Sequence, residues 1–270
     1  MHGLKSFFSI LFGDSSYPDR FLDLSLIRQA KIIKNPVLSY FHRLLCADLF
    51  KKLTTGRRVL ILGSGPSALE LQDIPEDVAL FTCNAGLKFI VDRRIQKPVD
   101  LYYYHKRKSE WAQSGIKDDL LRVEIRCFIS NLISAIRAAQ KSQDGKQIRT
   151  TVIRDFNRNN FYLKSLISPL HPVSLAANGI QWTTAGVRLL QYALYFEAKE
   201  VYLAGIDQTD DYFWGSKSRS LAEDPFEKKI LGIISKKFKN IFSLSANSPI
   251  TRYFPVRHLE ECSGERSRFC

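Results

Sequence analysis

The stretch Val59-Leu60-Ile61-Leu62-Gly63-Ser64-Gly65-Pro66-Ser67 decides the fold of this chain. Its four leading apolar residues are typical of a strand that is buried on both faces of a parallel sheet. The glycines after them let the backbone approach a ligand, and the helix-forming residues 68–71 would offer free N–H groups to an anion. The stretch therefore predicts a phosphate-bearing ligand, such as a nucleotide, at the carboxyl end of a sheet. The alternative is a plain turn between a strand and a helix.

Strand and helix patterns alternate along the rest of the chain. Apolar runs predict further strands at residues 78–83, 99–104, 123–129, 151–153, 200–205 and 241–245. Helical spacing of apolar residues predicts helices at 184–198 and 226–238. This alternation predicts an α/β, Rossmann-like fold with a mostly parallel sheet flanked by helices.

The chain divides by composition into three expected parts. Residues 56–258 form the Rossmann-like domain, and residues 259–270 form a polar C-terminal tail. Residues 1–55 form a helical extension, basic and amphipathic, which could lie on an anionic membrane surface. The alternative for this extension is that its helices pack on the main domain.

Charge and cysteine content narrow the class of protein. The 270 residues carry a formal net charge of +13, which favours an anionic partner such as an acidic substrate, a membrane surface or nucleic acid. No basic-aromatic RNA motif or recognition helix is present, so we expect no nucleic-acid partner. The five cysteines are scattered, which argues against a zinc site or a disulfide framework. With no apolar run of about 18 residues and no signal-peptide cleavage site, we expect a cytoplasmic location, peripheral on the inner membrane face at most.

Several polar residues stand where strands end or helices begin. Asn84 could hydrogen-bond a base or ribose, or close an Asx turn. Thr184 could help the first amides of its helix hold a phosphate, or simply cap the helix. Asp207 could meet a ribose hydroxyl or a proton in transfer, and His105 could act as a general base; each could instead be structural. The carboxylates of Thr209-Asp210-Asp211 could hold a divalent metal, although their spacing is not distinctive.

Taken together, these segments resemble the bacterial sialyltransferases of glycosyltransferase family 42, which use CMP-activated nonulosonic acids. Gly63-Ser64-Gly65-Pro66-Ser67 matches the opening Gly-Asn-Gly-Pro-Ser turn of the family, and Phe81-Thr82-Cys83-Asn84 matches its Arg-Cys-Asn. Thr184-Ala185-Gly186-Val187 is similar to its Thr-Ser-Gly-Val helix start. Residues 199–207 are similar to its Lys-Glu-Ile-Tyr-Leu-Ser-Gly-Ile-Asp, and residues 243–249 to its Cys-Leu-Cys-Pro-Asn-Ser. The resemblance covers about residues 57–255.

The resemblance implies a modified GT-A type, Rossmann-like domain with a lid, transfer with inversion, and no metal or other cofactor. It also implies a set of residues that bind the CMP-sugar: Gly63, Ser64, Gly65, Pro66, Ser67, Asn84, Thr184, Ala185, Gly186, Asp207, Asn247 and Ser248. Three of these positions or their neighbours depart from the family pattern. Ser64 replaces an asparagine and Ala185 replaces a serine. Thr209 replaces the tyrosine that holds the leaving phosphate, for which Tyr212 is the candidate substitute.

The lid is the main departure. The family's lid carries a histidine base, whereas this chain has no histidine from residue 207 to residue 257, and the segment 208–223 is shorter than the full lid. His105 or Asp207 would then be the base, or the donor and acceptor differ, or activity is lost.

The sequence therefore predicts an inverting glycosyltransferase of lipopolysaccharide or capsule biosynthesis. It would move a sialic acid or related 2-keto sugar acid from a CMP-activated donor to a glycan or glycolipid acceptor, with His105, Asp207 and Tyr212 as catalytic residues. Its partners would be that donor, that acceptor and an anionic membrane surface, and a homo-oligomer stays open. The rival interpretations are an enzyme like the flagellin-modifying and pterin-pyrophosphokinase-like proteins, and an inactive nucleotide-binding protein at the membrane.

Overall fold

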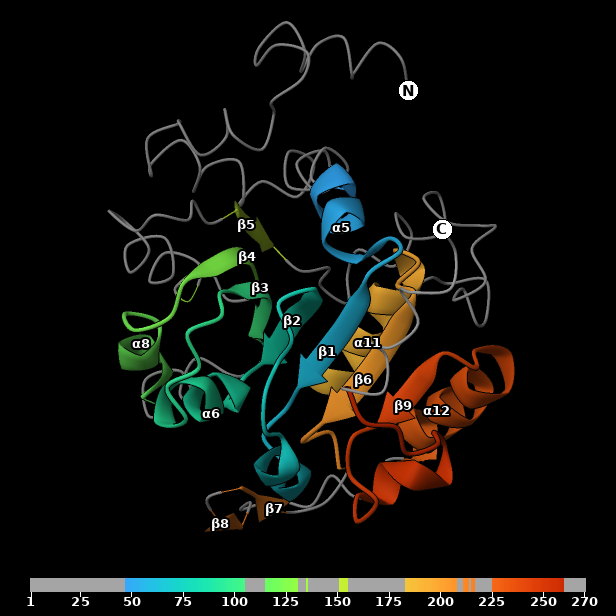
Figure 1. The fold of residues 1–270 in the computed structure, drawn as a ribbon. Coiled ribbons are helices and arrows are strands. Elements are labelled where there is room, and N and C mark those ends of the chain that lie inside the picture. Colours follow the sequence, from blue (N-terminus) through green and yellow to red (C-terminus); the bar gives the residue numbers. More distant parts are fainter. Residues whose placement is uncertain are drawn as a thin grey trace, which may run out of the picture.

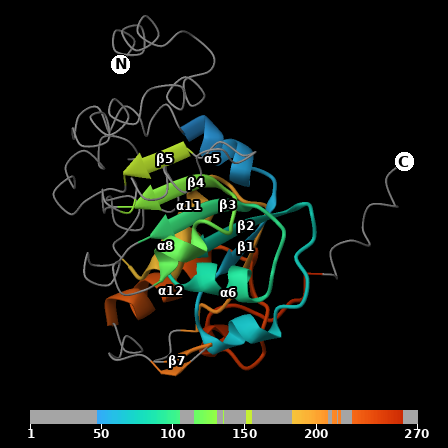
Figure 2. The same ribbon diagram turned by 90° about the vertical axis from the view of Figure 1, so that its left-hand side faces the viewer.

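Seven parallel strands form one sheet in the centre of the structure (Figure 1). The computed structural model describes residues 47–104, 115–130, 135, 151–154, 183–207, 211–213, 215–216 and 225–259. The strands are β1 (Arg58–Leu62), β2 (Val78–Cys83), β3 (Val99–Tyr104), β4 (Ile125–Ser130), β5 (Thr151–Arg154), β6 (Glu200–Ala204) and β9 (Ile241–Ser243). Their order across the sheet is β5-β4-β3-β2-β1-β6-β9, and Figure 2 shows β5 to β1 one after another.

The order of the strands reverses beside β1. From β1 the chain adds β2, β3, β4 and β5 on one side, and then returns to place β6 and β9 on the other side. In this register Leu62 pairs with Thr82 of β2 and with Ala204 of β6, so the three strands end level with one another. Ligands of open α/β sheets bind at such a reversal, outside the carboxyl ends of the strands. The Rossmann-like fold therefore places its expected binding edge at the turns after β1 and β6.

The central strands are buried because helices cover the sheet and leave their side chains no contact with water. All five residues of β1 and all six of β2 are buried, as their continuous apolar sequence predicts. Arg58 is the polar exception in β1. Its guanidinium binds both carboxylate oxygens of Asp77 and donates to the carbonyl of Leu259 at 2.9 Å, which satisfies the charge at this end of the strand.

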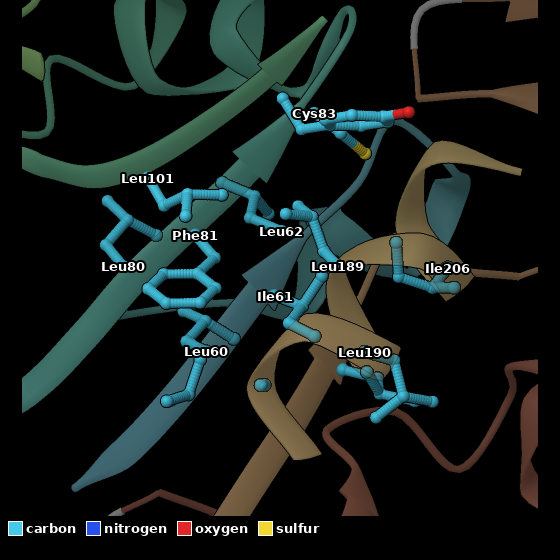
Figure 3. Close-up of a cluster of buried hydrophobic side chains, with 14 of the residues drawn as sticks. Leu60, Ile61, Leu62, Leu80, Phe81, Cys83, Leu101, Leu189, Leu190 and Ile206 are labelled. Carbon is cyan, nitrogen blue, oxygen red and sulfur yellow. The ribbon is translucent and has the colours of Figure 1, made fainter. Parts of the chain in front are cut away.

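Helices of several lengths flank the sheet. They are α5 (Ala47–Thr54), η1 (Pro66–Glu70), α6 (Gly86–Asp92), α8 (Ile116–Asp119), α11 (Ala185–Tyr195), α12 (Pro225–Lys237) and η3 (Pro249–Arg252). Helix α11 packs across β1, β2, β3 and β6, whereas α6 packs on β2 and α8. Figure 3 shows Leu189 and Leu190 of α11 in one apolar cluster with Ile61 of β1 and Phe81 of β2.

A two-stranded hairpin lies outside the main sheet. It consists of β7 (Asp211–Tyr212) and β8 (Gly215–Ser216), which pair antiparallel. Phe213, between the two strands, donates its N–H to the carbonyl of Ser64 at 2.9 Å. The ring of Phe213 also packs edge-on against the ring of Phe89, with 5.3 Å between the two ring centres. These contacts fix the hairpin beside the turn after β1, as Figure 1 shows at the lower edge of the sheet.

The sequence-based fold is confirmed, with local differences. Strand β4 begins at Ile125 rather than at the predicted residue 123. The sequence did not predict α6, α8 or the β7–β8 hairpin. Residues 1–46 lie outside the described residues, so the helical extension stays a prediction there. In α5, the last helix of that extension, Leu53 is buried in the core and Thr54 donates to the carbonyl of Phe196 at 2.9 Å.

Among the helices that the structure describes, none combines the length and the apolar character that a membrane span requires.

Candidate functional site

The turns after β1 and β6 lie against each other at the strand-order reversal. The N–H of Gly63 donates to Ala204, and that of Gly65 donates to the carbonyl of Gly205, both at 2.8 Å. A Cβ atom on Gly63 would collide with the carbonyl oxygen of Gly205. The glycines predicted to let a ligand approach are thus needed first for the contact between two segments of the chain itself.

A buried carboxylate joins three loops at this point. Asp207, with only 4% of its surface exposed, follows β6. Its Oδ2 accepts the N–H of Ser67 at 2.8 Å, and its Oδ1 accepts the hydroxyls of Ser67 and of Ser248, the latter at 2.5 Å. The hydroxyl oxygen of Ser67 in turn accepts the N–H of Gly205 at 2.8 Å. Asp207 therefore links the segments that leave β1, β6 and β9.

The amides after β1 serve this internal network, which corrects one expectation. The residues after the turn were predicted to start a helix with free N–H groups for an anion. They form instead the five-residue 3₁₀ helix η1, in which Ser67 donates to Asp207 and Ala68 donates to Gly65. An internal carboxylate thus takes the amide that an external anion would otherwise accept. Between Gly63 and Ser67, the half-buried Ser64 is the residue whose N–H makes no hydrogen bond within the described part of the chain.

The loop after β9 is hydrogen-bonded to η1. Glu70, at the end of η1, accepts the hydroxyl of Ser245 at 2.6 Å and the side-chain amide of Asn247 at 3.3 Å. Ser248 accepts the N–H of Ile250 at 3.4 Å and so caps η3. Asn247 is exposed, whereas Ser245 and Ser248 are buried. Of the two predicted contacts in this loop, Asn247 is the one whose side chain reaches the surface.

Asn84 follows β2 with a backbone φ of 45°, in the left-handed region that asparagine tolerates better than most residues. Its N–H donates to Tyr103 at 3.0 Å, and its carbonyl accepts the hydroxyl of Tyr102 at 2.9 Å. Burial raises the pKa of Tyr102 well above its usual value, and the nearby Tyr104 adds to the effect, so the phenol stays a neutral donor. A Cβ on Gly86 would lie 2.7 Å from the carbonyl of Leu62, which places this turn directly beside the turn after β1.

The start of α11 also has an internal carboxylate. Thr184 donates its N–H at 2.6 Å and its hydroxyl at 2.8 Å to Glu227 of α12, a residue with 2% of its surface exposed. Ala185 and Gly186 form the first turn of α11 and are buried. A Cβ on Gly186 would collide with the side chain of Ile206, so α11 packs closely on the turn after β6.

The predicted catalytic residues differ in how they are placed. Asp207 lies at the centre of the three-loop network. Tyr212 lies in β7, next to Phe213, whose amide bonds to Ser64. His105 comes directly after β3 and lies outside the described residues, as do Thr209 and Asp210.

The structure brings the predicted segments to one edge of the sheet. The turns at Gly63–Ser67 and 205–207 and the loop at Ser248 meet through hydrogen bonds, and Asn84 and Gly186 lie beside them. The sequence did not single out Glu70, Glu227, Ser245 or Phe213. No local pattern marks these residues, because each binds a partner that is more than 40 positions away.

Within the described part of the chain, no group of three or more His, Cys, Asp or Glu side chains could hold a metal ion. The metal-free chemistry expected from the resemblance stays a prediction.

No protein family model matches the chain, and no curated protein matches it. It is similar to several solved structures, including three of sialyltransferases. The sialyltransferase CstII from Campylobacter jejuni in complex with the substrate analogue cytidine-5'-monophosphate is 17% identical, with 75% of this chain and 86% of that chain covered and a TM-score of 0.43. The sialyltransferase CST-II in complex with a trisaccharide acceptor and CMP is 20% identical, with coverages of 74% and 86% and a TM-score of 0.44. CstII from Campylobacter jejuni in complex with CMP-3FNeuAc is 19% identical, with coverages of 74% and 85% and a TM-score of 0.42.

Proposed function

We propose that the protein is a glycosyltransferase that takes a CMP-activated sugar acid as donor. The sugar would be a sialic acid or a related 2-keto acid, transferred with inversion to a glycan or glycolipid such as a lipooligosaccharide or capsule precursor. One observation carries the proposal. The turns after β1, β2, β6 and β9, which hold the motifs resembling family 42, meet at the carboxyl edge where the strand order reverses.

The exposed and half-buried polar residues of this edge are the ones we assign to the donor. The carbonyl of Ser64 accepts the N–H of Phe213 in the hairpin, and we assign the N–H and the hydroxyl of Ser64 to the phosphate of CMP. Asn84 follows β2 and Asn247 follows β9, on opposite sides of β1 in the strand order, and both would meet the nucleoside. Preorganised donors of this kind stabilise a leaving phosphate as its charge develops.

The acceptor hydroxyl must lose a proton while the bond to the anomeric carbon forms. We assign this step to His105, because it is the next residue in the chain after Tyr104, where β3 ends at the same edge of the sheet. A neutral imidazole can accept a proton near neutral pH. Tyr212, next to the anchored Phe213, is the residue we assign to the departing phosphate.

A ligand screen tests the proposal. Thermal unfolding is followed with CMP, CMP-Neu5Ac, CMP-Kdo, CMP-pseudaminate, and UDP- or GDP-sugars. A ligand present at 100 times its Kd adds about 2.7 kcal/mol to the free energy of unfolding. We expect CMP and one of the CMP-sugars to raise the melting temperature and the protein to release CMP from that sugar. Stabilisation by a UDP- or GDP-sugar alone would contradict the proposal.

Two further measurements separate the rival functions. Turnover that EDTA abolishes would favour pyrophosphate transfer, which needs a metal. Stabilisation by CMP without any release of CMP would favour a nucleotide-binding protein that lacks catalysis. For the base, His105→Ala should lower kcat strongly while leaving CMP affinity near the wild-type value.

A further inference from the structure

Two carboxylates fasten the loop after β9 to helix η1. Asp207 binds Ser67 of η1 and Ser248 of the loop, and Glu70 of η1 binds Ser245 and Asn247 of the same loop. We call these six residues the carboxylate clamp. Its Asp207 half is closed from water, because Ser67, Ser248 and Asp207 have 6%, 3% and 4% of their surfaces exposed.

The hydrogen positions at Asp207 are fixed by the partners. Ser67 accepts the N–H of Gly205, so its own hydroxyl proton points to Oδ1 of Asp207. Ser248 accepts the N–H of Ile250, so its hydroxyl proton also points to Oδ1. Oδ2 accepts the backbone N–H of Ser67 and abuts Gly65, where a Cβ would collide with it.

An acceptor hydroxyl therefore has no route to Asp207 without breaking the clamp. A general base must lie within hydrogen-bond reach of the proton that it removes. Asp207 instead faces two serine hydroxyls and an amide of its own chain. The same reasoning applies to Ser67 and Ser248, whose hydroxyls are used inside the clamp and do not face a ligand.

We propose that Asp207 is a positioning residue, and that the carboxylate clamp holds the loop bearing Asn247 in register with the turn bearing Ser64. This assignment removes Asp207 from the candidate bases and moves Ser67 and Ser248 from substrate contact to support. The expected effect of the clamp on nucleotide affinity rests on the proposed function. The expected effect of the clamp on the order of the three loops is independent of the proposed function.

Hydrogen exchange of the ligand-free protein tests the loops. Asp207→Asn replaces one acceptor oxygen by an NH₂ group that must face a donor, so the network cannot be satisfied. We expect amides in residues 63–71, 204–207 and 243–250 to exchange faster together, by about tenfold or more. The loss of one buried hydrogen bond favours local opening of the chain by a factor of about that size. Asp92→Asn, at an exposed carboxylate of α6 paired with Lys88 at 3.4 Å, is the matched control and should leave these segments unchanged.

Ser248→Ala is the milder variant, since it removes one donor and leaves the carboxylate in place. It should speed exchange in residues 204–207 and 243–250 even if Asp207→Asn does not fold. Unchanged exchange in both segments for Ser248→Ala would overturn the proposal, as would faster exchange in only one of the three segments for Asp207→Asn.

Nucleotide binding and turnover give the second readout. We expect Asp207→Asn to weaken CMP binding about tenfold, and Ser248→Ala to have an affinity between those of Asp207→Asn and the wild type. The pH at which turnover rises should be the same in Asp207→Asn as in the wild type. A loss of kcat at full CMP affinity and unchanged exchange would assign Asp207 to the reacting atoms and overturn the proposal. If wild-type protein does not bind CMP, the proposed function fails, and the exchange experiment still decides the role of the clamp.

Discussion

Gly65 has no side chain because the carboxylate of Asp207 occupies the space that a Cβ atom would need. Gly65→Ala would push Asp207 away from Ser67 or shift the turn after β1. Overpacking of this kind costs about 1–3 kcal/mol. We expect the free energy of unfolding to fall by that amount in a denaturant titration.

Gly232 of α12 provides the control for this substitution. No atom lies within 4 Å of a Cβ built there, and the residue is inside a helix. Gly232→Ala should therefore raise the free energy of unfolding by roughly 0.5–1 kcal/mol, because alanine loses less backbone entropy than glycine. Equal effects of the two substitutions would contradict the assigned contact between Gly65 and Asp207.

Asn84 combines an unusual backbone conformation with a side chain that we assign to the nucleoside. Asn84→Gly keeps the positive φ and removes only the side chain, whereas Asn84→Ala also introduces strain of about 1–2 kcal/mol. We expect Asn84→Gly to melt close to the wild type and to lose stabilisation by CMP in a thermal-shift assay. Unchanged CMP binding in Asn84→Gly would remove this residue from the site.

A buried carboxylate joins helices α11 and α12. Glu227 accepts both the amide and the hydroxyl of Thr184, at the positive end of the α11 dipole. Glu227→Gln leaves an NH₂ group facing one of these donors. The expected cost is about 1–3 kcal/mol in the free energy of unfolding.

The control for this contact is Lys229→Gln, which changes an exposed side chain on the same helix. It should shift the free energy of unfolding by no more than about 0.5 kcal/mol. Thr184→Val should lower the free energy of unfolding by part of the amount that Glu227→Gln does. If Glu227→Gln unfolds with the same free energy as the wild type, the contact between Glu227 and Thr184 contributes little to stability.

Helix α8 carries an acid whose ionisation opposes folding. Burial raises the pKa of Asp119, and Asp92 and Asp118 add to the effect while Lys88 and Arg122 oppose it. The pKa of Asp119 is higher in the folded state than in the unfolded state. Its ionisation therefore lowers the free energy of unfolding at neutral pH, and this loss of stability disappears once the pH falls below the pKa of the unfolded state. Asp119→Asn should therefore melt above the wild type at about pH 7, and the difference should shrink toward about pH 4. A difference that grows on acidification would contradict this sign.

The whole molecule carries an excess of positive charge, formally +13. We expect the protein to bind vesicles that contain anionic lipid and to leave neutral vesicles unbound. Salt should release it, because the Debye length falls from about 8 Å at 0.15 M to about 3 Å at 1 M ionic strength. Binding that persists at 1 M salt, measured by sedimentation, would point to apolar insertion rather than charge.

The sequence predicted the elements that are stabilised by their own local pattern, and it missed those that are too short for such a pattern or depend on distant contacts. Strands β2 and β3 have the predicted bounds, because a strand covered on both faces needs an unbroken apolar run that is visible locally. Helix α6 was missed because seven residues are too few for a clear helical period. The hairpin was missed because its short strands are held through Phe213, whose partners Ser64 and Phe89 are far away in the chain.

The sequence by itself determined that this chain forms a parallel α/β sheet and that glycine, asparagine and aspartate residues follow its strands. These features depend on hydrophobic periodicity and on backbone conformations that a few residue types accept, and both can be recognised within a short window. Only the tertiary structure decided what those residues do to one another. Asp207, Ser67 and Ser248 share hydrogen bonds across up to 140 positions, and Glu227 takes the donors of Thr184 from another helix. A buried donor or acceptor binds whichever group the fold brings within about 3 Å, and that neighbour is set by how the strands and helices pack.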